Sequence, residues 1–309
     1  MEHRPLPQSI AVVILNWNAA EDTIRCVRSL MDWQTLRPDI WIVDNASTGD
    51  DVAQLARAFP QAHILRNERN LGFAGGTNRG IRAALEQGDL PILLLNNDAQ
   101  VAEPDVQRLL ETLYSEEAVG CVGPLLYEAA PTGRLLAAGG RNPVLHHQSH
   151  IFPLKPGPAV RTMAYVPGTV ALVRPGLFHR VGLLDERYFF SMEVADLCRR
   201  AAQQGYRSVV DTRARAIHAL ERSAPLRGTL HIYYIIRNRF LFIRNFYKGA
   251  GKAALFFVWA TYSVALWLKL RLQGAEPTAR AVWLGVGDGL QGRFGGQNER
   301  VLAFVKGTG

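Results

Sequence analysis

Two apolar runs of this chain each end abruptly in polar residues, and this pattern limits its fold more than any other feature. Residues 93–95 (Leu-Leu-Leu) run directly into Asn-Asn-Asp at 96–98. Residues 41–43 (Trp-Ile-Val) run into Asp44 and Asn45. Continuous apolar runs are typical of strands buried on both faces of a parallel sheet, and open α/β sheets bind ligands outside the carboxyl ends of their strands. The two runs therefore predict a parallel sheet with a polar ligand site at that edge.

Strand-like and helix-like segments alternate along the first half of the chain. This alternation predicts right-handed crossovers and a Rossmann-like, doubly wound sheet with helices on both faces, so the expected fold class is α/β. Strands are expected at 11–15, 40–44, 62–66 and 91–96, and helices at 21–31, 50–58, 78–87 and 103–114, with a glycine-rich loop at 70–77. Further strands are expected at 119–122, 170–173 and 208–211, and a long surface excursion at 127–165.

The length and the distribution of charge predict two parts. A chain of 309 residues that is 48% hydrophobic is long enough for one large domain and an appendage. Residues 1–220 carry 22 Lys and Arg against 23 Asp and Glu, whereas residues 221–309 carry 13 against 4. We therefore expect a domain over 1–220 and a basic, hydrophobic helical region over 221–309. The three cysteines are widely spaced, which favours buried thiols over a disulfide framework, and residues 1–8 contain no apolar signal core, which argues against secretion.

Residues 189–200 contain the densest set of candidate catalytic side chains. Glu193 and Asp196 are three residues apart, so a helix places both carboxylates on one face. Phe189 and Phe190 beside them would exclude water and raise the pKa of a carboxyl toward the working range of a general base. The alternative is that the two carboxylates only stabilise a helix N-terminus through its dipole.

Asp98, Asp44 and His218 are the other candidate ligand residues. Asp98 offers a carboxylate after a strand, and a hard cation such as Mg²⁺ binds one or two protein carboxylates and completes its shell with substrate phosphate oxygens. Asp44 is placed to accept the imide N–H of uracil or thymine, and the helix that follows favours anions at its N-terminus. The alternatives are a helix cap at Asp98 and an Asx turn at Asp44. His218 follows the strand expected at 208–211, and a single His is more often structural than a ligand.

Taken together, these segments resemble the family 2 inverting glycosyltransferases of the GT-A fold, particularly the bacterial rhamnosyltransferase-like branch. The resemblance spans roughly residues 10–220, and the collinear order of its pieces makes it strong. The pieces are Val13-Ile14-Leu15-Asn16-Trp17-Asn18, Val43-Asp44-Asn45-Ala46-Ser47, Asn70 to Gly80, Leu95-Asn96-Asn97-Asp98, Gly182 to Glu186 with Phe189-Phe190, Glu193-x-x-Asp196-Leu197-Cys198 and His218.

The resemblance implies a metal-dependent enzyme that moves a single sugar, with inversion, from a UDP- or dTDP-linked donor to an acceptor hydroxyl. It implies a mixed, mainly parallel sheet. It also implies that Asp44 reads the base, that Asp98 binds Mg²⁺ or Mn²⁺ as the last member of an Asp-x-Asp motif, and that His218 lies near the diphosphate or the metal. The residues that it implies for the donor site are Asn16, Asn18, Asp44, Asn70, Asn78, Arg79 and Asn97.

The chain departs from the family pattern at one position. The family usually has Glu-Asp-x-Asp where this chain has Glu193-Val194-Ala195-Asp196, and the second residue of that motif commonly acts as the base. Because Val194 cannot accept a proton, we expect Glu193 to act as the general base, with Asp196 as the second choice and loss of transferase activity as the third. The alternative functions are a sugar-phosphate nucleotidyltransferase and a non-catalytic nucleotide-sugar-binding or scaffold protein.

The C-terminal region combines cations with a long apolar stretch. Residues 253–268 hold no charge and are bracketed by Lys252 and Lys269. A helix of this length reaches only about 24 Å, short of a hydrocarbon core of about 30 Å, so we expect an interfacial or re-entrant helix on an anionic membrane surface. Burial of the helix against the first domain is the alternative. The expected setting is the cytoplasmic face of the plasma membrane, with a lipid-linked or glycan acceptor from cell-envelope polysaccharide synthesis and without nucleic-acid binding.

Overall fold

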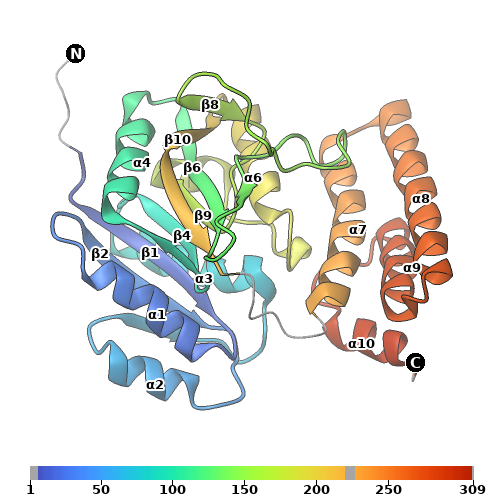
Figure 1. Cartoon of the computed structure of the whole chain (residues 1–309), viewed down its shortest axis with the longest axis horizontal. Helices are drawn as coiled ribbons and strands as arrows, with labels where there is room; N and C mark the ends of the chain where they lie inside the picture. The colour runs from blue at the N-terminus through green and yellow to red at the C-terminus, as the bar shows by residue number, and fades with distance from the viewer. Residues whose placement is uncertain (1–5, 220–226, 308–309) are drawn as a thin grey trace. The chain divides into compact units, whose positions relative to one another are not determined.

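The computed structural model describes residues 6–219 and 227–307, which form two compact units (Figure 1). Over these described residues, unit 1 consists of 6–142, 148–184 and 194–219, and unit 2 consists of 143–147, 185–193 and 227–307. The predicted division at residue 220 lies outside the described residues and stays a prediction. Two short segments that the sequence analysis placed in the first domain, 143–147 and 185–193, cluster with unit 2.

Unit 1 is built on one mixed sheet. Its strands are β1 (Ser9–Asn16), β2 (Arg37–Asp44), β3 (His63–Arg66), β4 (Ile92–Asn96), β5 (Ala99–Val101), β6 (Val119–Glu128), β7 (Leu135–Ala137), β8 (Val160–Met163), β9 (Val170–Val173) and β10 (Arg207–His218). The main path runs β3-β2-β1-β4-β9-β6-β10-β5. The first four strands of this path are mutually parallel, β6 is parallel to β10, and β9 runs antiparallel between β4 and β6. The predicted mixed, mainly parallel sheet is therefore confirmed.

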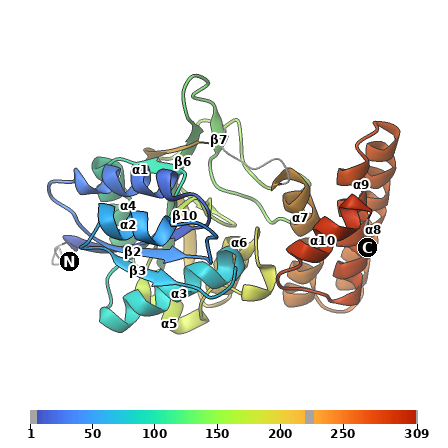
Figure 2. The ribbon, with the colours of Figure 1, turned by 90° about the horizontal axis from the view of Figure 1, so that it is seen from below.

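Helices cover both faces of this sheet. They are α1 (Ala20–Met31), α2 (Asp51–Ala58), α3 (Gly72–Gln87), α4 (Glu103–Ser115), α5 (Pro175–Val181) and α6 (Glu193–Gln203), and a 3-10 turn, η1 (Glu186–Tyr188), precedes α6 in unit 2. Figure 2 shows α1, α2 and α4 on one side of the sheet and α3 and α5 on the other. Successive side chains of β1 point to opposite faces of the sheet, and on one face Val12 and Ile14 join the core that contains Leu30 of α1.

Helix α3 begins at Gly72, so most of the glycine-rich stretch that was expected to be a loop over 70–77 is helical. The reason is the close approach of α3 to the sheet. A Cβ added to Gly80 would lie 2.6 Å from Val13 Cγ1 and 3.0 Å from Val43 Cγ2. Glycine lowers helix propensity, but here it admits the side chains of two strands. Gly80 lies within the helix expected at 78–87, whereas Gly75 and Gly76 were expected in the loop. Their packing partners lie far away in the sequence, as Leu15 does for Gly76, where an added Cβ would clash with Leu15 Cδ1.

Strand β10 continues to His218, whereas the sequence predicted a strand over 208–211 only. The pairing of β10 with β6 shifts register between Asp211 and Arg215, and it resumes as far as His218. The carboxylate of Asp211 is fully buried at this irregularity and accepts a hydrogen bond of 2.7 Å from Thr112 Oγ1. The irregularity breaks the apolar alternation that marks a strand in sequence, which is why the second half of β10 was missed.

Unit 2 is mainly helical in the part of the chain that the structure describes. Its helices are α7 (Arg227–Phe246), α8 (Gly249–Leu272), α9 (Glu276–Gln291) and α10 (Asn298–Lys306). The helix expected at 253–268 is present and extends over Gly249–Leu272, 24 residues. At about 1.5 Å per residue it reaches about 36 Å, so the expectation that it is too short to span a hydrocarbon core is wrong. Helix α9 packs against both α7 and α8, and the hydroxyl of Tyr233 on α7 donates to Asp288 Oδ2 on α9 at 2.7 Å. By length and composition, α8 is the one helix within 6–219 and 227–307 that is suited to cross a membrane.

The close packing of α3 leads to a testable prediction. We expect Gly80→Ala to lower the free energy of unfolding, because overpacking against two stiff valines costs roughly 1–3 kcal/mol and exceeds the gain in helix propensity of about 1 kcal/mol. Urea denaturation followed by circular dichroism measures the change. The matched control is Gly287→Ala in α9, where an added Cβ meets no atom within 4 Å and should be neutral or stabilising. Equal effects of the two substitutions would contradict the packing argument.

Candidate functional site

A buried hydrogen-bond network occupies the carboxyl ends of β1 and β2. The side-chain amide of Asn16 donates to Asp44 Oδ1 at 2.9 Å and to Asp51 Oδ2 at 3.0 Å. Its carbonyl oxygen accepts from Thr23 Oγ1 at 2.7 Å, and Thr23 in turn accepts from the amide of Asn97 at 3.1 Å. Three predicted donor-site residues, Asn16, Asp44 and Asn97, therefore lie in one connected network. It joins two strands to the first turns of α1 and α2.

Asp44 supports the turn that follows β2. Its side chain has no exposed surface, and its two oxygens accept from Asn16 Nδ2 and from the N–H of Ser47, the latter at 3.1 Å. Asn18 is exposed and has a positive φ of 51°, with its side-chain oxygen accepting from the N–H of Thr48 at 2.8 Å. In this conformation Asp44 shapes the edge of the sheet, whereas Asn18 is exposed to solvent.

A second group of amides links the turn after β2 to the start of α3. Asn45 donates to Asn70 Oδ1 at 2.9 Å and accepts from the amide of Asn67 at 2.9 Å. Arg79 donates to Asn67 Oδ1, also at 2.9 Å. Asn70 and Arg79 were predicted as donor-site residues, but Asn45, which connects them, was not. The position of Asn45 directly after Asp44, at the end of a strand, could have indicated this role. The sequence pattern was interpreted only as evidence for a polar edge of the sheet.

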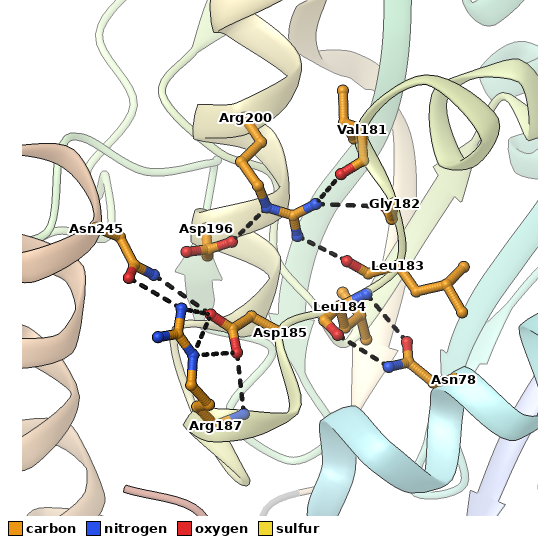
Figure 3. A network of polar contacts seen from close by, with 10 residues as sticks. All are labelled: Asn78, Val181, Gly182, Leu183, Leu184, Asp185, Arg187, Asp196, Arg200 and Asn245. Atoms are coloured by element: carbon orange, nitrogen blue, oxygen red, sulfur yellow. Dashed lines mark hydrogen bonds and ion pairs between the residues drawn. The ribbon is translucent and has the colours of Figure 1, made fainter.

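Asn78 was also predicted for the donor site, and the structure places it in a main-chain clamp. Its amide donates to the carbonyl of Leu184 at 2.8 Å, and its oxygen accepts from the N–H of Leu184 at 3.0 Å (Figure 3). The side chain is buried. The side chain of Asn78 therefore pairs with the main chain of Leu184 as a neighbouring strand would, and it fixes residues 182–184 against α3 within unit 1.

Asp98 and His218 meet at the far edge of the same sheet. His218 Nε2 lies 3.0 Å from Asp98 Oδ1, and the two side chains are 12% and 13% exposed. Antiparallel pairing of β10 with β5 brings them together, because His218 lies opposite Ala99 and the N–H of Ala219 donates to the carbonyl of Asp98 at 2.9 Å. Two residues that are 120 positions apart in the chain thus form one pair.

The donor set at this edge fits a hard divalent cation. A carboxylate and an imidazole are suitable protein ligands, and Mg²⁺ or Mn²⁺ completes its shell with water and substrate phosphate oxygens. The side-chain oxygen of Asn96, two residues before Asp98, is buried and accepts no hydrogen bond from the residues that the structure describes. Those residues contain no cluster of three or more His, Cys, Asp or Glu with metal-ligand geometry. A cation here would therefore depend on a bound diphosphate for most of its ligands.

The two carboxylates expected to share a helix face have different environments. Asp196 is 1% exposed and forms an ion pair with Arg200, whose Nε lies 2.6 Å from Asp196 Oδ1. Arg200 also donates to the carbonyls of Val181 and Leu183, the latter at 2.7 Å, so this pair ties α6 to the chain that follows α5 (Figure 3). Asp196 is thus committed to a structural contact. Val194, at the position where the family has its base, is buried and packs against Gly168.

Glu193 is the first residue of α6 and is 7% exposed. It clusters with unit 2, together with the segment 185–192 that leads into it. Phe189 in that segment is buried and stacks on Tyr234, with ring centroids 5.2 Å apart. The ring of Phe189 packs on α7, and the exclusion of water from the carboxylates of Glu193 and Asp196 stays a prediction.

Comparison with known proteins gives a consistent set of matches. The model of glycosyl transferase family 2 matches residues 11–163. N-acetylglucosaminyl-diphospho-decaprenol L-rhamnosyltransferase of Mycobacterium tuberculosis is 27% identical over 272 residues, which cover 80% of this chain and 87% of that protein. The dTDP-rhamnosyl transferase RfbF of Shigella flexneri is 24% identical over 212 residues, covering 66% and 70% of the two chains. A mannosyltransferase of Pyrobaculum calidifontis, solved with GDP-Man and Mn²⁺, has a TM-score of 0.59 at 14% identity, covering 94% and 92%.

The contacts of Asp44 lead to a testable prediction. We expect Asp44→Asn to destabilise the protein by roughly 1–3 kcal/mol, because an amide cannot accept at both positions and leaves a buried donor unsatisfied. Chemical denaturation measures the change. The control is Asp50→Asn, whose carboxylate is 66% exposed and should tolerate the change within about 0.5 kcal/mol. An Asp44→Asn protein as stable as the wild type would show that the network is not required at this edge.

Proposed function

Because this chain belongs to glycosyl transferase family 2 and has the GT-A fold, as its sequence predicted, we propose that it is a metal-dependent, inverting enzyme. It transfers a single sugar from a UDP- or dTDP-linked donor to an acceptor hydroxyl. The pairing of Asp98 with His218 supports this proposal, since it brings together a carboxylate and an imidazole that could hold a cation at the carboxyl edge of the sheet, where α/β folds bind their ligands. Membership of this enzyme family favours the transferase over the nucleotidyltransferase and scaffold alternatives.

We assign the donor to the edge formed by β1, β2 and β4. The exposed side chain of Asn18 is available for direct contact with the nucleotide. Asp44 contributes to reading the base through the position of the turn after β2, because its two oxygens are buried and accept from Asn16 and Ser47. The remaining donor-site assignments shape the pocket through the amide contacts described above. These residues are Asn16, Asn70, Asn78, Arg79 and Asn97.

The chemical step that we propose is direct displacement at the anomeric carbon. Glu193 removes the proton of the acceptor hydroxyl while that oxygen attacks, and we prefer it to Asp196 because the latter is bound to Arg200. A Mg²⁺ or Mn²⁺ ion held by Asp98 and His218 would offset the negative charge of the departing nucleoside diphosphate. Burial of Phe189 near the start of α6 limits the access of water that would otherwise compete as acceptor.

We propose a lipid-linked glycan as the acceptor. The name of the Mycobacterium tuberculosis relative describes transfer of rhamnose to N-acetylglucosaminyl-diphospho-decaprenol, which is a lipid-linked sugar. The name of the Shigella flexneri relative gives dTDP-rhamnose as its donor. Such an acceptor places the enzyme in cell-envelope polysaccharide synthesis, at the cytoplasmic face of the plasma membrane.

Helix α8 supplies the surface that we propose for membrane contact. One side of this helix forms an apolar stripe with helical spacing, in which Phe257 is 73% and Leu272 is 80% exposed. Only 11% of the residues in the 18-residue apolar stretch of α8 are buried, which argues against the alternative of a helix packed inside the protein. Lys252, Lys269 and Arg271 near its ends can face acidic headgroups. The apolar stripe consists of Ala254, Phe257, Val258, Val264, Ala265, Leu268 and Leu272.

The first test concerns the reaction. We expect release of nucleoside diphosphate from UDP- or dTDP-sugars in the presence of Mn²⁺ and a lipid-diphosphate-sugar acceptor, and loss of that release when EDTA removes the metal. Glu193→Gln should lower kcat by roughly 10²–10⁴-fold, since it removes the general base, while donor affinity measured by calorimetry is retained. The control is Glu117→Gln, an exposed residue between α4 and β6, which should keep wild-type kcat. Wild-type turnover by Glu193→Gln would reject Glu193 as the base.

The second test concerns the membrane. We expect the protein to float with vesicles that contain phosphatidylglycerol and to bind less to neutral vesicles or at high salt. Phe257→Ser combined with Leu268→Ser should weaken binding by about tenfold or more, because each large apolar side chain contributes roughly 1.5 kcal/mol or more when it leaves water. The control is Phe152→Ser, an exposed apolar residue outside the stripe. Equal flotation of the stripe variant and the wild type would remove α8 as the docking surface.

A further inference from the structure

The segment that leads into α6 holds three non-glycine residues in the left-handed region of φ. The φ values are 63° at Phe189, 70° at Ser191 and 74° at Met192. At Phe189 the chain makes a strained γ-turn, with ψ of −55° and a hydrogen bond of 2.7 Å from the N–H of Phe190 to the carbonyl of Tyr188. Conformations of this kind are unfavourable for side-chain-bearing residues and persist only where surrounding contacts enforce them.

Asn238 of α7 enforces this conformation. Its side-chain amide donates to three carbonyls of the strained segment, those of Tyr188 at 3.1 Å, Phe190 at 2.8 Å and Ser191 at 2.8 Å. The side chain is fully buried. A relaxed segment would turn these carbonyls away and leave the amide without acceptors in the interior, which is costly. The amide and the strained turn therefore require each other.

Arg237, the preceding residue, fixes the same segment from a second direction. Its guanidinium is fully buried and donates to the carbonyls of Tyr188 at 2.8 Å and Arg187 at 3.2 Å. It also donates to the side-chain oxygen of Asn238 at 2.8 Å, and it lies over the ring of Tyr234, 4.7 Å from the centroid. A buried cation is expensive to maintain, so its contacts with the main chain offset a large desolvation cost. This arrangement holds the segment rigidly.

The start of the segment is anchored separately. Arg187 forms an ion pair with Asp185, with Nη2 2.7 Å from Oδ2, and donates to Asn245 Oδ1 at 3.0 Å (Figure 3). Asn245 lies two helical turns after Asn238 on α7. Helix α7 thus forms hydrogen bonds with both ends of the segment 185–191, and Glu193 follows only two residues later.

We propose that Asn238, supported by Arg237, is a positioning residue that sets the place of the Glu193 carboxylate by fixing the strained segment 187–192. The inference rests on the proposed role of Glu193 as the general base. The chain enters α6 directly from Met192, so any relaxation at 189–192 rotates or translates the first residue of the helix. A misplacement of about 1 Å at a reacting group costs about 10²-fold in rate.

The test uses Asn238→Asp in the full-length protein. Asp keeps the oxygen that accepts from Arg237 and removes the amide donors to the three carbonyls. We expect kcat to fall by about 10²-fold with an unchanged donor KM, and amide hydrogen exchange at 188–192 to become faster. The matched control is Leu241→Ala, a fully buried residue of the same helix whose apolar side chain cannot donate a hydrogen bond, which should lower Tm without changing loop exchange or kcat. Wild-type kcat and exchange in Asn238→Asp would overturn the proposal.

A double variant separates positioning from other effects. In a Glu193→Gln background, Asn238→Asp should not reduce the residual activity further, because the group that it positions is already inactive. Additive losses would overturn the proposal that Asn238 acts through Glu193. If Glu193→Gln alone retains wild-type turnover, the assignment of the base fails, whereas the exchange result for Asn238→Asp still reports on the loop.

A second substitution keeps the test decisive if Asn238→Asp does not fold. Glycine adopts positive φ without strain, whereas a β-branched residue does not. Ser191→Gly should therefore retain kcat, and Ser191→Val should lower kcat at an unchanged donor KM. Equal kcat values for these two variants would overturn the role of the strained segment.

Discussion

The buried amide of Asn16 is the contact on which the edge of the sheet depends. Its donors and acceptor connect β1 with Asp44 at the end of β2, with Asp51 in the first turn of α2, and with Thr23 in α1. Unsatisfied polar groups in the interior are costly, so each member of this network holds the others in place. The edge is consequently rigid before any ligand arrives. A preorganised polar edge of this kind is what a nucleotide-binding sheet requires.

The two units use buried polar groups for different purposes. In unit 1, Asn78 and Arg200 replace missing main-chain partners, one for Leu184 and the other for the carbonyls of 181–183. These contacts stabilise ordinary backbone conformations. In unit 2, Asn238 and Arg237 stabilise a segment that is intrinsically unfavourable. Stored strain next to a carboxylate is typical of functional positions, because stability alone would favour its removal.

Helix α8 differs from an ordinary surface helix in the distribution of its apolar and charged side chains. Its exposed side is apolar, and its few cations lie near its ends. In water such a face is a liability, because large contiguous apolar patches drive association. At a lipid surface the same face is stabilising, and the cations add attraction to acidic headgroups. A lipid surface would therefore account both for the lipid-linked acceptor that we propose and for the composition of this helix.

The sequence by itself determined the type of sheet, most strand positions and the residues at the strand ends, because period, apolarity and polar tips are local properties. It also identified the family, since the order of short motifs survives where overall identity is low. It missed the helical glycines of α3, the second half of β10 and the hub role of Asn45. Each of these depends on partners distant in the chain: Leu15 and Asn45 for Gly76, β5 and β6 for His218, and Asn67 and Asn70 for Asn45. Only the tertiary structure decided that Asp196 is bound to Arg200 and that α7 holds the strained segment before Glu193. Hydrogen-bond partners and positive φ angles are set by packing, and they produce no periodic pattern in the sequence.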